Sequence, residues 1–376
     1  MSISIQIHRS IAEVGKFTDA WRALEEKTAL TTRADHASLM HWWERYGQVK
    51  NRKLGQEQQL CVVAIQRGRE LAACLPLELI RRKKRFFLFT ELVFLSQPMN
   101  GALLDIVHDG LTVAEVVQVF LLLKKQLRYD LLNLSYLPEN SILRQAFAKN
   151  NHLHSAIPFI SVAGDYDEVR KNEYSQNLKQ VLNKFKRRID EAGRGIEGRM
   201  LIGRAAIEAI KEQIQRVSLT KLKAKDMHSV YADPLTGERY FSTIMEKPEP
   251  YCSIYVKDGG DLLAYNLGFR QNDVVYFLDT AFDREYADAR KIGLGILALD
   301  QMVRHYAGKC RVIELGFGLD DYKFRFTKRA VITFQLLLPG RGLLAAMLFR
   351  WERKKMVLNG QKVIVILKKY DIPLSS

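Results

Sequence analysis

Two cations and two glycines stand close together in this chain, in the order Arg290, Lys291, Gly293 and Gly295. An apolar run precedes them and a helical pattern follows, so the glycines fall where a loop enters a helix. The first N–H groups of a helix have no acceptor within it and lie at the positive end of its dipole. Because glycine has no β-carbon, an anion can approach such a backbone closely. The spacing therefore predicts a cradle for a pyrophosphate group.

This spacing differs from those of two common nucleotide-binding loops. It is not the six-residue glycine fingerprint of dinucleotide-binding folds. It is also not a P-loop, because no Lys followed by Ser or Thr comes after the glycines.

The elements that position the cradle are a strand, a helix and a second strand. Residues 274–278 are apolar and rich in β-branched and aromatic side chains, which favours a buried strand. Gly308 is placed to end the helix near Tyr306, and residues 311–315 predict the second strand. One face of the helix is apolar, because hydrophobic side chains recur at three- and four-residue spacing: Ile292, Ile296, Leu299 and Val303.

Acidic, glycine and tyrosine residues follow the second strand, in the segment Glu314-Leu315-Gly316-Phe317-Gly318-Leu319-Asp320-Asp321-Tyr322-Lys323. This segment resembles the Asp-x-Gly-x-Gly-x-x-x-Tyr-Lys signature of the CelD/BcsL-type acyltransferases. The Arg-x-x-Gly-x-Gly pattern before it resembles the coenzyme A loop of the GNAT superfamily, to which those enzymes belong. There are two departures: Glu314 replaces the usual Asp, and Lys291-Ile292-Gly293 replaces the usual Ser-Pro-Gly.

The resemblance implies acyl transfer from acyl-CoA, by direct attack of an acceptor amine or hydroxyl on the thioester. Backbone N–H groups of residues 279–281 would face the developing oxyanion. The implied coenzyme-binding residues are Thr280, Ala281, Arg290, Lys291, Ile292, Gly293, Leu294 and Gly295. No metal is expected, because neither the cysteines nor the histidines show metal-ligand spacing.

The same resemblance implies catalytic roles. Tyr322 would protonate the leaving thiolate, and Lys323 would neutralise a phosphate or lower the pKa of Tyr322. The base for the acceptor would be Asp279, Asp283 or Glu314. A carboxylate at a strand end that only caps a loop is the structural alternative for each of these.

A basic helical stretch between the two halves also resembles the family, which carries Ser-x-Asn followed by basic residues. Here Ser175 and Asn177 are followed by Lys184, Lys186, Arg187 and Arg188. We expect Ser175, Asn177 and Arg187, together with Asp283, to contact the acceptor. A solvated helix face on a basic protein explains the same pattern equally well.

The first half of the chain repeats the order of elements of the second. A hairpin is predicted around Gly68, a strand at residues 103–107, a helix at 112–127, a strand at 130–134 and a helix at 139–149. The chain thus predicts two tandem GNAT-like domains of the α/β (α+β) class, each a mixed, mostly antiparallel sheet flanked by helices. The expected domains are residues 1–160, without a coenzyme loop and forming one wall of the acceptor site, and residues 161–376.

Composition limits the partners. A net charge of +16 favours anions: coenzyme A, an acidic acyl carrier protein, a lipid surface or, less favoured, nucleic acid. The scattered cysteines are expected to be buried free thiols. With no signal peptide or membrane span evident, we expect a cytoplasmic protein, or one held peripherally at the inner membrane. The tail predicts an amphipathic helix at residues 343–356 and a strand at residues 362–367.

Three functions fit these patterns. The first is N- or O-acyl transfer from acyl-CoA to a sugar, amino acid or lipid or polysaccharide precursor, as in bacterial exopolysaccharide synthesis. The second is transfer from aminoacyl-tRNA, as in the related Fem-type enzymes; the absence of a long antiparallel helical arm disfavours it. The third is a non-catalytic GNAT-like protein that binds its partner through a basic face.

Overall fold

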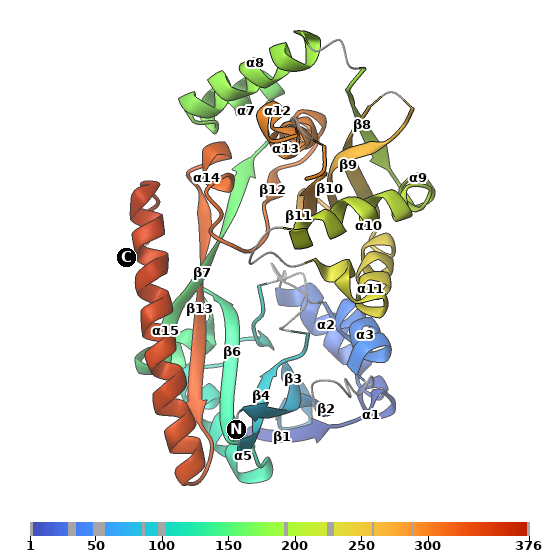
Figure 1. Cartoon of the computed structure of the whole chain (residues 1–376). Coiled ribbons are helices and arrows are strands. Elements are labelled where there is room, and N and C mark those ends of the chain that lie inside the picture. The colour runs from blue at the N-terminus through green and yellow to red at the C-terminus, as the bar shows by residue number, and fades with distance from the viewer. Residues whose placement is uncertain are drawn as a thin grey trace. The chain divides into compact units, whose positions relative to one another are not determined.

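The computed structural model describes residues 3–28, 35–47, 57–84, 87–96, 103–191, 195–223, 229–257, 259–286 and 289–373 (Figure 1). The chain forms two compact units. Residues 1–156 and 331–376 make the first unit, and residues 157–330 make the second. The break near residue 157 lies close to the expected domain boundary, whereas residues 331–376 pack in the first unit and not in the second.

The first unit contains a six-stranded sheet of order β1-β2-β3-β4-β6-β13. All neighbours are antiparallel except β4 and β6, which are parallel and are joined through α5. The short strand β5 pairs with β3. The strands are β1 (Ile3–His8), β2 (Glu57–Arg67), β3 (Glu70–Lys84), β4 (Phe87–Phe94), β5 (Val107–His108), β6 (Leu131–Pro138) and β13 (Ala330–Pro339). The helices are α1 (Ile11–Gly15), α2 (Thr18–Thr28), α3 (His36–Trp42), α5 (Val113–Gln126), α6 (Ile142–Ala146) and α15 (Leu343–Lys369).

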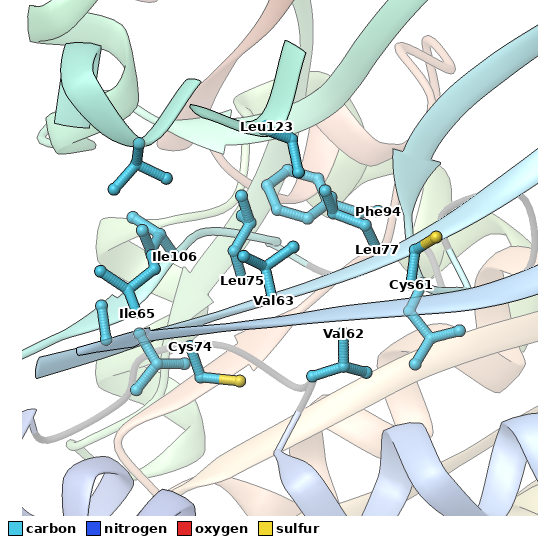
Figure 2. Close-up of a cluster of buried hydrophobic side chains, with 14 of the residues drawn as sticks. Cys61, Val62, Val63, Ile65, Cys74, Leu75, Leu77, Phe94, Ile106 and Leu123 are labelled. Carbon is cyan, nitrogen blue, oxygen red and sulfur yellow. The ribbon is translucent and has the colours of Figure 1, made fainter. Parts of the chain in front are cut away.

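The core of the first unit follows from alternation along β2 and β3. Val62 and Val63 point to opposite faces of their strand, and Val63 lies with Leu75 and Phe94 on the side of α5 (Figure 2). Gly68, with φ of 68°, makes the predicted β2–β3 turn. The tryptophans near the N-terminus pack in this core, and all four cysteines are buried free thiols, as expected.

The second unit repeats the arrangement with a six-stranded sheet of order β7-β12-β11-β10-β9-β8. Here β11 and β12 are the parallel pair, and α13 joins them. The strands are β7 (Asn151–Ser161), β8 (Glu197–Ile202), β9 (Glu249–Val256), β10 (Leu262–Gln271), β11 (Val274–Phe282) and β12 (Val312–Glu314). The helices are α7 (Tyr166–Asn172), α8 (Gln176–Glu191), α9 (Arg204–Glu208), α10 (Lys211–Leu219), α11 (Pro234–Met245), α12 (Ala289–Ile292), α13 (Leu294–Tyr306) and α14 (Lys323–Phe326).

The two units share the order of three antiparallel strands, a helix and a parallel strand, so the predicted fold class is confirmed. They differ at the start of the joining helix. In the first unit Thr112 caps α5: its hydroxyl accepts from the N–H of Glu115, whose carboxylate accepts from the N–H of Thr112. These side chains already accept hydrogen bonds from N–H groups at the N-terminus of α5. At the start of α13, in contrast, Gly293 provides no side-chain cap.

Three predictions of secondary structure were wrong. Residues 362–367 belong to α15 and not to a strand; Val363 and Leu367 are one helical turn apart and both buried, so packing outweighs their β-propensity. Only Val107 of the strand expected at residues 103–107 is in a strand. The helix expected at 139–149 is reduced to α6, starting at the Ser141 cap, and a 3₁₀ turn at Ala148–Asn150. Among the described residues, no helix has the length and apolar composition to cross a membrane.

Candidate functional site

The parallel pair β11–β12 separates partway along its length. The strands pair from Val274 with Val312 to Tyr276 with Glu314, where β12 ends. The next residue, Leu315, donates its N–H to the carbonyl of Pro158 on β7 at 2.8 Å, so the chain leaves β11. Because β11 continues to Phe282, its edge beyond Tyr276 is not paired by β12. The divergence leaves an opening between the two strands beyond Tyr276.

A β-bulge lies at this opening. Gly268 of β10 pairs with Phe277 and Leu267 pairs with Asp279, which leaves Leu278 as the extra residue of β11. Residues two apart on a regular strand share a face. Here Phe277 packs in the cluster beneath α13, whereas Asp279 bonds to Tyr265 in the cluster on the other face of the sheet. The bulge thus turns Asp279 away from the face of Phe277.

Asp279 is held by three partners. The hydroxyl of Tyr265 donates to its Oδ2 at 2.6 Å, and the Nζ of Lys221 lies 3.0 Å from its Oδ1. The N–H of Thr280 donates to the same Oδ1 at 2.9 Å, so one of the three expected oxyanion donors is already engaged. The side chains of Lys221 and Asp279 are only 14% and 12% exposed, so this is a nearly buried ion pair.

Tyr322 lies within the electrostatic range of this carboxylate. Burial raises the pKa of Tyr322, and the charges of Asp320 and Asp279 raise it further. The hydroxyl is therefore protonated at neutral pH, as a proton donor must be, and its raised pKa makes it a weaker acid than an ordinary tyrosine.

Lys323 fastens the loop that precedes Tyr322. Its side chain is 3% exposed, and its Nζ donates to the carbonyls of Phe317 and Gly318 and pairs with Asp320 at 3.4 Å. A buried ammonium with these partners stabilises the loop and does not face a phosphate. Burial and two carboxylates raise the pKa of Tyr322, and Lys323 is not among the causes of this shift.

The glycine segment differs from the expected loop. Residues Ala289–Ile292 form the short helix α12, Gly293 takes a left-handed conformation with φ of 71°, and α13 starts at Leu294. A Cβ on Gly293 would lie 2.0 Å from the ring of Phe185, so the missing side chain makes room for α8 and not for an anion. Gly295 lies in the first turn of α13, where a Cβ would meet only Phe282, at 3.6 Å. Gly295 is thus the glycine that leaves open space.

The remaining coenzyme-binding candidates could offer a ligand only backbone groups or a side-chain charge. Ile292 and Leu294 are buried in the core, so only their backbone groups are available to a ligand. Ala281 is likewise buried, whereas Lys291 is exposed. The side chain of Arg290 lies outside the described residues.

Helix α8 rests on this segment through contacts that the sequence motifs did not indicate. Arg188, on α8, donates a hydrogen bond to the carbonyl of Lys291 in the last turn of α12. Asp300, 2% exposed within α13, accepts from the hydroxyls of Tyr166 at 2.6 Å and Tyr174 at 3.1 Å, and its Oδ2 lies 3.5 Å from Lys186. The one feature of the sequence that could have indicated these contacts is Asp300 itself, an acidic residue on the otherwise apolar, buried side of α13.

The residues expected to contact the acceptor make other contacts. Ser175 is next to the start of α8 and accepts from the N–H of Leu178 at 3.2 Å, as an N-cap does. Asn177 is exposed, and Arg187 pairs with Glu191 one turn away in solvent. Asp283 is buried and is held by Arg216 at 2.7 Å.

Of the predicted catalytic residues, Asp279 is near enough to Tyr322 for its charge to raise the pKa of the Tyr322 hydroxyl. Glu314 lies half-buried at the end of β12, between Tyr276 of β11 and Phe159 of β7. Lys221 and Tyr265 complete the surroundings of Asp279, and sequence analysis missed both. Throughout the described ranges, no three His, Cys, Asp or Glu side chains are grouped as a metal site would need.

Comparison with known proteins agrees with this geometry. Residues 176–324 match the Acetyltransferase (GNAT) domain family. No curated protein matches the chain. Among solved structures, FemX covers 93% of this chain and 99% of its own at 10% identity, with a TM-score of 0.58. A tandem GNAT protein from the clavulanic acid biosynthesis pathway covers 91% and 100% at 13% identity, with a TM-score of 0.51.

A further match is a conserved protein of unknown function from Bacteroides thetaiotaomicron, which covers 89% of this chain and 100% of its own at 9% identity, with a TM-score of 0.50. At these identities the structural matches establish the fold alone. The family match includes the β11–α13–β12 unit, the glycine segment and Tyr322. Residues 176–324 therefore resemble a GNAT acetyltransferase domain, and the chain shares the fold of a tandem GNAT protein.

Proposed function

We propose that this protein transfers an acyl group from acyl-CoA to an amine or hydroxyl, by direct attack of the acceptor on the thioester. The observation that carries this proposal is the edge of β11 beyond Tyr276, which β12 does not pair and which lies within the segment that matches the GNAT family; Asp279 lies on this part of the strand. Such an edge offers backbone N–H and C=O groups to an amide-containing chain, as a neighbouring strand would.

The residues at the start of α13 fit the diphosphate of coenzyme A. In the first turn of α13 the N–H of Ile296 donates to the carbonyl of Gly293 at 3.0 Å, whereas Gly293 provides no side-chain cap for the N–H groups of Leu294 and Gly295. Gly295 leaves open space beside them, and the exposed Lys291 adds a positive charge. These groups would hold the diphosphate, and the thioester end would extend toward the opening between β11 and β12.

Two proton transfers are needed, one to the leaving thiolate and one from the attacking acceptor, and we assign them to different residues. Tyr322, kept protonated by burial and by nearby carboxylates, gives its proton to the thiolate as the thioester breaks. Asp279 acts through its charge, because its lone pairs are engaged by Tyr265, Lys221 and Thr280. We assign acceptance of the acceptor's proton to Glu314, because it ends the strand that borders the opening.

The acceptor class follows from the motif after β12. The segment from Glu314 to Lys323 resembles that of CelD/BcsL-type acyltransferases, so a sugar, amino acid or lipid or polysaccharide precursor is the proposed acceptor. A role in exopolysaccharide synthesis and an acyl carrier protein as alternative donor are part of the same proposal.

A second candidate is transfer of an aminoacyl group from aminoacyl-tRNA. The net charge of +16 favours it, because a polyanionic donor would be attracted to the chain. The likeness to FemX is compatible with it but shows only a shared fold. A third candidate is a non-catalytic protein that binds an anionic partner through its basic surface. Such a protein would have no use for the opening between β11 and β12.

A comparison of donors tests the proposed function. Purified protein is incubated with a panel of amines, amino sugars and hydroxylated sugars and with acetyl-CoA, a longer acyl-CoA or aminoacyl-tRNA. We expect acceptor-dependent release of free thiol from acyl-CoA. Release is expected to change little with salt, whereas binding of a polyanion weakens by close to one logarithmic unit of slope per phosphate neutralised. Transfer from aminoacyl-tRNA alone would overturn the acyl-CoA assignment.

A further inference from the structure

Helix α15 is anchored to the first unit along one side only. Figure 1 shows it as a single long helix beside β13. Met356 packs against Leu131 of β6 and Leu337 of β13. Asn359 donates to the carbonyl of His154 at 2.9 Å, and Gly360 lies so close to Leu153 that a Cβ would be 3.2 Å from its carbonyl oxygen. These contacts fix which side of α15 faces the sheet.

Large apolar side chains cover the opposite side of α15. Leu343 is 86% exposed, Met347 63%, Leu358 51% and Val365 67%. Their spacings of four, eleven and seven residues place them on one side of a helix, because these intervals are close to whole turns. Trp351, one turn after Met347, is 43% exposed on the same side. The helix thus exposes an apolar stripe that no described part of the chain covers.

Basic side chains border this stripe, and Lys354 lies within it, between Trp351 and Leu358. The segment Leu343–Lys369 holds only one acid, Glu352, against a set of exposed basic residues: Arg350, Arg353, Lys354, Lys355, Lys362, Lys368 and Lys369. Lys355 lies 3.8 Å from the ring centroid of Trp351. A helix with an exposed apolar stripe and a basic rim matches the surface of an anionic bilayer, which offers acyl chains below and phosphate groups above.

Other occupants fit these side chains less well. A second copy of the chain would bring two basic helices together, and their like charges would repel. Nucleic acid would satisfy the basic residues but leave Leu343, Met347 and Leu358 in water. We propose that the outward face of α15 is a docking surface for anionic lipid bilayers, with the helix lying parallel to the membrane plane. This inference stands independently of the proposed reaction.

The tryptophans provide a specific readout. The chain has four tryptophans, and Trp21, Trp42 and Trp43 are buried in the first unit, at 0%, 4% and 5% exposure. Trp351 is therefore the tryptophan whose surroundings change when α15 enters the headgroup region. We expect phosphatidylcholine vesicles that contain phosphatidylglycerol to shift the fluorescence to shorter wavelength, and pure phosphatidylcholine vesicles to shift it little. In Trp351→Phe the shift disappears while co-sedimentation with anionic vesicles remains.

Two sets of variants separate the stripe from its rim. The pair Met347→Glu and Leu358→Glu is expected to weaken vesicle binding by about tenfold or more, because each loses its apolar insertion. The double variant Lys354→Gln with Lys362→Gln removes two positive charges. We expect it to weaken binding to anionic vesicles by about fivefold per charge removed. The matched control is Leu121→Glu, which replaces a 59% exposed leucine on α5 and is expected to leave binding unchanged.

Three results would overturn the proposal. The first is a wild-type protein that does not co-sediment with anionic vesicles. The second is binding that survives both sets of variants. The third is a dimer, measured by sedimentation in the absence of lipid, that Met347→Glu dissociates while vesicle binding is absent; it would assign the stripe to a second copy.

Discussion

Replacing Tyr322 by Phe is expected to lower turnover by about 10²-fold or more while acyl-CoA affinity stays unchanged. The substitution removes only a hydroxyl from this side chain. The ring keeps its packing in the second unit. A group that donates a proton only as the thioester breaks affects the rate and not the binding of the ground state.

Thermal unfolding of the same variant separates catalysis from loop stability. The loop of Gly316 and Gly318 is fastened by Lys323, so Tyr322→Phe should leave the melting temperature unchanged. Because the pKa of Tyr322 is raised above its ordinary value of about 10, deprotonation of this group should not limit activity at any lower pH. Near-normal turnover of the folded variant would remove Tyr322 from the mechanism.

Breaking the Asp279–Lys221 pair is expected to destabilise the second unit by about 3–5 kcal/mol. Both side chains are nearly buried, so Asp279→Asn leaves the ammonium of Lys221 without its counter-charge in a poorly solvated position. Lys221→Met has the converse effect, because Asp279 then keeps only neutral donors, the hydroxyl of Tyr265 and the N–H of Thr280. Urea denaturation of the variants measures these losses.

The double variant Asp279→Asn with Lys221→Met is the control. It removes both charges together, so no unpaired buried charge remains. Its loss of unfolding free energy should therefore be smaller than the sum of the losses in the two single variants. Additive losses would show that the two side chains do not interact, in contradiction to the 3.0 Å contact.

Local sequence signals predicted the unit that positions the site. The apolar run at β11, the three- and four-residue periodicity of α13 and the stop at Gly308 each depend on neighbours along the chain. The departure at residues 362–367 has a tertiary cause. Two β-branched pairs there resemble a strand, but Val363 and Leu367 reach the core only when the segment continues as a helix.

The site itself was predicted incompletely, because its partners come from distant segments. Gly293 matches an anion-binding pattern, yet Phe185, more than a hundred positions away, fills the space beside it. Lys221 and Tyr265 meet Asp279 only because a bulge at Leu278 changes the direction of β11. No periodicity in the sequence reports such a bulge, so the side chains around Asp279 emerge only from the folded chain.

Calorimetric titration with acyl-CoA, of the wild-type protein and of Gly295→Val, tests the central claim most directly. We expect saturable binding at one site in the wild type, and an affinity lower by about tenfold or more in Gly295→Val, equivalent to about 1.4 kcal/mol. The variant should remain folded, because a side chain at position 295 meets only Phe282 at ordinary contact distance and valine favours a helix more than glycine does. Absence of acyl-CoA binding by the folded wild-type protein, or equal affinity in the folded variant, would contradict the proposed site.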